Sequence, residues 1–114
     1  MHTINRSIAI IKPKQPFVDW ANQLPDAEWK ALLDDFKTDC LAILIPEYET
    51  DEEAKGYINE IYEDIFIEIL FGWCIEESWF PQDRTDEMFW RWFEVELHSI
   101  VMDSCMEPIE KGVP

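Results

Sequence analysis

The stretch DEMFWRWFEVELH, residues 86–98, holds four aromatic side chains and four carboxylates around one arginine and one histidine. When it is projected as a helix, Phe89, Phe93 and Leu97 fall on one side and form an apolar face. Thr85 stands directly before the first two acids, where a capping hydroxyl belongs. The stretch therefore predicts a helix that follows Thr85, reaches about Cys105 and buries its aromatic side.

The same projection predicts a solvent-exposed side whose residues could bind a metal ion. Glu94 and His98 are spaced by one helical turn, so both could point at one metal ion, although di-iron carboxylate proteins use Glu-x-x-His instead. On the preceding helix Glu60, Asp64 and Glu68 follow at i, i+4 and i+8, where like charges repel unless a cation or basic group faces them. These five residues are candidate metal ligands; the alternatives are ordinary solvated faces and pairing with lysine or arginine from elsewhere in the fold.

Upstream segments supply further elements. Thr50-Asp-Glu-Glu53 has the form of a capping box and predicts a helix over 51–71 that ends at Gly72. The apolar run 40–45, closed by Pro46, predicts a strand covered on both faces. Near the N-terminus, 5–12 predicts a strand, 17–24 a short helix, and 26–36 a second helix.

These elements predict an α+β fold in one domain, residues 1–114, with a short frayed C-terminal tail. The order is β-α-α-β-α-α, and a strand, helical crossover and strand favour a parallel pair. Such a two-stranded sheet is marginal alone. We therefore expect about four helices to cover it, or a second copy to extend it in a homodimer.

A second candidate site follows from the parallel pairing. The carboxyl ends of parallel neighbours share one edge of the sheet, where open α/β sheets bind ligands. The turns at that edge would be 12–16 and 46–49. They contribute the candidate binding residues Lys12, Lys14, Gln15, Glu47 and Tyr48; the alternative is a purely structural, salt-bridged pair of turns.

Composition limits the classes of function. Twenty-five acidic residues against nine basic ones give a formal net charge of −16, which disfavours direct binding of nucleic acid or of an anionic membrane surface. A basic protein partner would be attracted. A DNA-binding protein would also be attracted if the acidic surface imitates DNA. With 47% hydrophobic residues the chain can still bury a core.

The spacing of the cysteines and the lack of long apolar runs and nucleotide-binding motifs predict a cytoplasmic protein without a cofactor. The three cysteines are far apart, with no C-x-x-C pair, and no apolar run is long enough to span a bilayer. We therefore expect a reducing cytoplasm and no membrane. The chain has only three glycines and no nucleotide-binding motif, so we expect no cofactor.

Three motifs resemble a family of small acidic uncharacterised bacterial proteins. They are K-P-K-Q-P-F-x-D-W at 12–20, G-W-C at 72–74 and W-F-x-V-E-x-H-S at 92–99, and the resemblance covers nearly the whole chain. It implies a free-standing bacterial cytosolic protein and supplies no activity, cofactor or catalytic residue.

The sequence favours a non-enzymatic protein-binding or regulatory module with a basic partner. The alternative is a small metal-dependent hydrolase, or another enzyme, that uses the helix carboxylates and His98.

Overall fold

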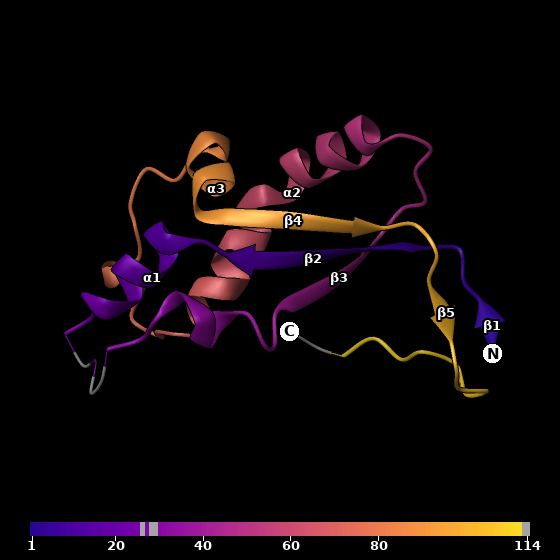
Figure 1. The fold of residues 1–114 in the computed structure, drawn as a ribbon, viewed down its shortest axis with the longest axis horizontal. Helices are drawn as coiled ribbons and strands as arrows, with labels where there is room; N and C mark the ends of the chain where they lie inside the picture. Colours follow the sequence, from indigo (N-terminus) through magenta and orange to yellow (C-terminus); the bar gives the residue numbers. More distant parts are fainter. Residues whose placement is uncertain (26, 28–29, 113–114) are drawn as a thin grey trace.

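The computed structural model describes residues 1–25, 27 and 30–112. Within these residues it contains three α-helices and two small antiparallel sheets (Figure 1). The helices are α1 (Gln15–Asn22), α2 (Asp51–Phe71) and α3 (Asp86–Trp92), with short 3-10 helices at Leu33–Phe36 and Glu77–Trp79. The strands are β1 (His2–Thr3), β2 (Ser7–Pro13), β3 (Leu41–Ile45), β4 (Phe93–His98) and β5 (Met102–Asp103).

The larger sheet has the strand order β3-β2-β4, and β2 is antiparallel to both neighbours. Ala9 of β2 pairs with Ile43 on one side and with Leu97 on the other. The short strands β1 and β5 pair separately beyond one end of this sheet (Figure 1).

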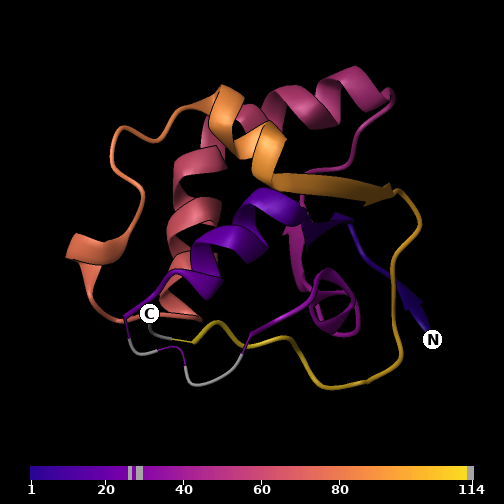
Figure 2. The same cartoon turned by 60° about the vertical axis from the view of Figure 1, so that its left-hand side comes forward.

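The three-stranded sheet is covered on one face. Ser7, Ala9 and Ile11 of β2 are buried, whereas Ile8 and Ile10 between them are only half-buried. Figure 1 shows α2 behind the strands, and Figure 2 shows α1, α2 and α3 close together; none of the described helices lies over the opposite face of the sheet in Figure 1. The largest fully buried side chains, which form the centre of the core, are Phe17, Phe66, Phe89, Phe93, Ile11, Ile45, Ile58 and Leu70.

Local signals placed several elements correctly. The prediction of a helix over 51–71 is confirmed, with the Glu53 amide donating to the Thr50 hydroxyl at 3.2 Å and Gly72 at the C-cap. The reciprocal bond of the capping box runs to the amide of Glu49 instead of Thr50. The α+β class and the two predicted strands are also found.

The predicted architecture is wrong. Phe93–His98 does not continue α3 but forms β4, so the sheet gains a third strand and the last helix ends at Trp92. The pairing of β2 with β3 is antiparallel instead of parallel. Because β4 and the helices complete the sheet within one chain, a second copy is no longer needed to support a bare two-stranded sheet.

Two smaller expectations also change. The predicted helix over 26–36 begins at residues 26, 28 and 29, which lie outside the described part of the chain, and its described end is only the 3-10 helix Leu33–Phe36. The strand predicted to be covered on both faces is covered on one. Leu44 of β3 is 47% exposed, because no helix in the described part of the chain packs over the outer face.

Candidate functional site

The two strand-end turns lie at opposite ends of the sheet. Because β2 and β3 are antiparallel, Ile11 pairs with Leu41 while Ser7 pairs with Ile45. The end of β2 and the start of α1, where Lys12, Lys14 and Gln15 lie, are therefore separated by the length of β3 from Glu47 and Tyr48. Gln15 bonds Asp19 at 2.9 Å, and Tyr48 is half-buried in a concavity with Leu97 and His98. The structure does not bring this candidate set together.

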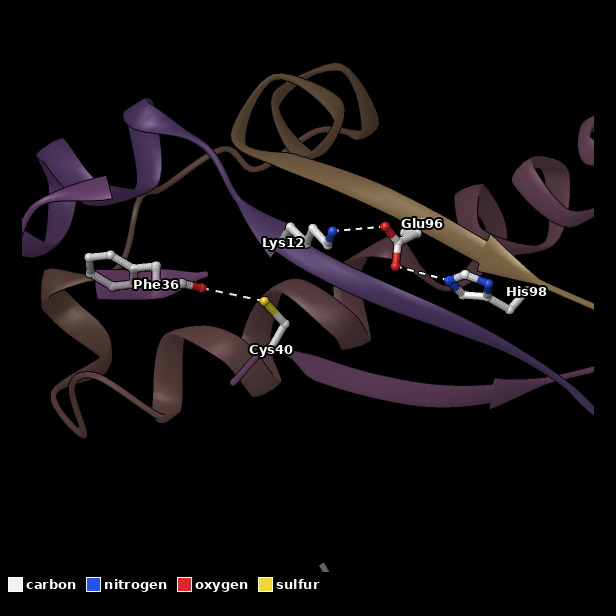
Figure 3. A network of polar contacts seen from close by, with 5 residues as sticks. All are labelled: Lys12, Phe36, Cys40, Glu96 and His98. Carbon is white, nitrogen blue, oxygen red and sulfur yellow. Dashed lines mark hydrogen bonds and ion pairs between the residues drawn. The ribbon is translucent and has the colours of Figure 1, made fainter. Parts of the chain in front are cut away.

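Lys12 instead takes a partner from β4 on the outer face of the sheet. Its Nζ donates to Glu96 Oε1 at 2.8 Å, and His98 Nε2 lies 2.9 Å from Glu96 Oε2 (Figure 3). The hydrogen bond with His98, followed by the bond from Lys12, lowers the pKa of Glu96 below its ordinary value. The same bond to Glu96 raises the pKa of Lys12. These groups form a compact ionic network on the uncovered face.

The candidate metal ligands are dispersed. Glu60, Asp64 and Glu68 are exposed on α2, whereas Glu94 and His98 lie on β4. Four residues along a strand span about 13 Å, so Glu94 and His98 do not converge as they would one turn apart on a helix. Among the described residues, no group of three or more histidine, cysteine, aspartate or glutamate side chains is arranged to hold a metal ion.

A groove of about 300 Å³ opens between the start of β3, the 3-10 helix Leu33–Phe36 and the C-terminal end of α2. Two aromatic rings border it: Phe36 and Trp73 lie 4.7 Å apart at an interplanar angle of 37°. Trp73 is 43% exposed, although its ring contacts the buried ring of Phe36. We call this site the acidic groove, defined by Asp35, Phe36, Asp39, Cys40, Glu68 and Trp73, with Ile11 and Leu41 among its other lining residues.

The electrostatics of the acidic groove favour a cation. Asp35, Asp39 and Glu68 line it, and no described lysine or arginine does. The C-terminal end of α2 also meets it at Gly72, and the last turn of that helix has no basic residue. A helix C-terminus carries a partial negative charge, so it adds to the field of the three carboxylates.

Cys40 places a thiol at the edge of the acidic groove. Its Sγ donates to the carbonyl oxygen of Phe36 at 3.4 Å (Figure 3). Partial burial raises the pKa of the thiol, although nearby Lys12 works in the opposite direction. Cys40 therefore stays protonated near neutral pH and is a weak nucleophile.

Sequence reasoning identified one member of the acidic groove, Glu68, and assigned it to a different site. The other members come from residues 35–40 and from Trp73, which are separated by α2 in the chain. The available signal was the pair of acids Asp35 and Asp39 flanking an aromatic residue immediately before a strand. That signal does not reveal which distant aromatic will contact Phe36.

Comparison of this chain with models of protein families, with curated proteins and with solved structures yields no match. Among the described residues, no helix combines the length and apolarity needed to cross a bilayer.

Proposed function

We propose that this protein is a non-enzymatic binding module that captures a basic segment of a partner protein in the acidic groove. The observation that carries the proposal is the contact of the tilted rings of Phe36 and Trp73 among three carboxylates, with no described basic residue lining the site. A net charge of −16 would also draw a basic partner from a distance.

A lysine or arginine side chain matches this chemistry. Its apolar stem can lie along Leu41, which is 36% exposed, while its charged end meets the carboxylates and the ring of Trp73. A volume of about 300 Å³ is at the lower end of the range for ligand sites, which suits one long side chain better than a large cofactor. Partly exposed tryptophans at interfaces frequently carry most of the binding energy.

We also place this interaction in the cytoplasm. All three cysteines are free thiols, with Cys40 half-buried, Cys74 buried and Cys105 exposed. Free thiols persist in a reducing compartment.

The experiment is calorimetric titration of the protein with a short, end-blocked peptide of alternating lysine and valine, at low and moderate salt. We expect Trp73→Ala to weaken binding at least tenfold, because truncation removes one of the two rings. We expect Glu68→Gln to weaken it about two- to fivefold, as for one partly solvated charge pair.

The matched controls are Trp79→Ala and Glu60→Gln. Trp79 is 38% exposed, close to the exposure of Trp73, but borders a different concavity beside Trp20. Glu60 is exposed on the same helix as Glu68 and does not line the groove. If both control variants lose as much affinity as the groove variants, binding depends on overall charge and the groove proposal fails.

A further inference from the structure

β3 is an edge strand without the usual protection. The strand order leaves one of its backbone edges unpaired, and among the described residues its only sheet neighbour is β2. Residues 41–45 are all apolar, and their five-residue register with β2 has no bulge. Leu41 and Leu44 are 36% and 47% exposed. Natural proteins normally blunt such an edge with charge, proline or a bulge, because it is a template for another strand.

The opposite edge of the same sheet shows the contrast. β4 has Glu94, Glu96 and His98 on its outer face, so charged or polar side chains alternate along it. A strand added at this edge would have to pack beside these charged and polar groups and the ionic network that they form with Lys12. Of the two edges of the three-stranded sheet, the one along β3 is therefore the unprotected one.

We infer that the basic segment binds as an added β-strand on the free edge of β3, with one of its cationic side chains in the acidic groove. This inference rests on the proposed function and specifies its binding mode. Leu41 belongs to both surfaces, since it begins β3 and lines the groove. A strand paired with β3 would thus continue directly over the groove, where the added backbone hydrogen bonds give affinity and the groove selects the side chain.

Charge selects a basic segment over a second copy of this chain. Asp39 lies just before β3, and Glu47 and Glu49 follow it. Antiparallel pairing of two copies of β3 would set the groove carboxylates of one copy beside Glu47 and Glu49 of the other, and parallel pairing would set Asp39 beside Asp39. Like charges placed together in this way oppose association, whereas a basic strand is attracted at both ends.

The test compares the lysine–valine peptide with a version N-methylated at every interior residue. The two have the same charges and side chains, but the second cannot donate backbone hydrogen bonds. We expect N-methylation to weaken binding at least tenfold. Leu44→Lys puts a charge on the outer face of β3. We expect it to weaken binding of the parent peptide more than Glu94→Lys does, although Glu94→Lys changes the net charge by two units instead of one.

The outcomes separate the two proposals. If the N-methylated peptide binds within twofold of the parent while Trp73→Ala still abolishes binding, strand addition is wrong and the groove proposal stands. If Glu94→Lys weakens binding of the parent peptide more than Leu44→Lys does, the free edge of β3 has no role in binding. If the free protein sediments as a dimer that Leu44→Lys dissociates, a second copy occupies the edge and the inference is overturned. If the parent peptide does not bind at low salt, both proposals fail.

Discussion

The backbone amide of Lys14 donates a hydrogen bond to the carbonyl oxygen of Trp92 at 2.8 Å. Trp92 is the last residue of α3, and Phe93 after it is already extended, with φ −135° and ψ 146°. The Nζ of Lys14 also donates to the carbonyl oxygen of Trp90 at 2.9 Å. Lys14 thus satisfies two carbonyl groups left open at the helix end and aligns the following strand with β2.

The change from helix to strand at this point predicts losses of stability of very different size for the truncation of two apolar residues. Phe93 is fully buried against Phe17 and Phe66, with ring centroids 5.5 and 5.3 Å away. Phe93→Ala should lower the free energy of unfolding by about 3–5 kcal/mol. Ile100 would share the buried face of a continuous helix but is 85% exposed in the structure.

Ile100→Ala should therefore change the free energy of unfolding by less than about 0.5 kcal/mol. Urea denaturation of the two variants measures both effects. A loss of more than about 2 kcal/mol in the Ile100 variant would contradict the assignment of residues 93–98 to a strand.

The ionic network predicts a pH dependence of stability. The pKa of Glu96 is lower in the folded protein than its ordinary value of 4.5. Its contribution to stability is therefore complete above about pH 4.5 and is lost as the pH falls through the folded pKa. The pKa of Lys12 is raised above 10.5, so its contribution is complete below that pH and is lost as the pH rises through the raised value.

Glu96→Gln tests the acidic limb. We expect the variant to be less stable than the unaltered protein at pH 7 and the difference to shrink as the pH falls below 4.5, measured by urea denaturation at each pH. Glu94→Gln, on the same face of β4, is the matched control and should change the acidic limb less. Parallel stability–pH curves for the unaltered protein and Glu96→Gln would rule out this role of Glu96.

The two N-caps predict a common loss of stability. Thr50 accepts from the amide of Glu53 at 3.2 Å, and Thr85 accepts from the amide of Met88 at 3.1 Å. Replacement of either by alanine leaves a helix amide without its side-chain acceptor and should cost about 1 kcal/mol. Thr38→Ala, at an exposed position outside the helices, is the control and should be nearly neutral in a thermal denaturation experiment.

The thiols predict an order of alkylation. Cys105 is exposed and should react first with iodoacetamide, whereas Cys40 is half-buried with a raised pKa and Cys74 is buried. If the groove binds a basic segment, the lysine–valine peptide should slow modification of Cys40 and leave that of Cys105 unchanged. Peptide mapping by mass spectrometry measures both rates; equal protection of the two thiols would indicate an effect unrelated to the groove.

The sequence alone determined the elements whose signals are local. Thr50 marks the start of α2 and Gly72 marks its end, because a side-chain cap and a helix end act within a few residues. Short runs rich in isoleucine placed β2 and β3 because side chains of that shape fit a pleated surface. With these elements the α+β class followed.

Only the tertiary structure decided the last strand and the acidic groove. Phe89, Phe93 and Leu97 are spaced by four, as on a helix, while Phe93–His98 also alternates apolar and polar residues, as on a strand. The unpaired edge of β2 resolves this ambiguity, because pairing satisfies the backbone of both strands and buries Phe93. The groove likewise exists only because the antiparallel sheet and α2 bring Phe36 to Trp73, a contact that neither local sequence encodes.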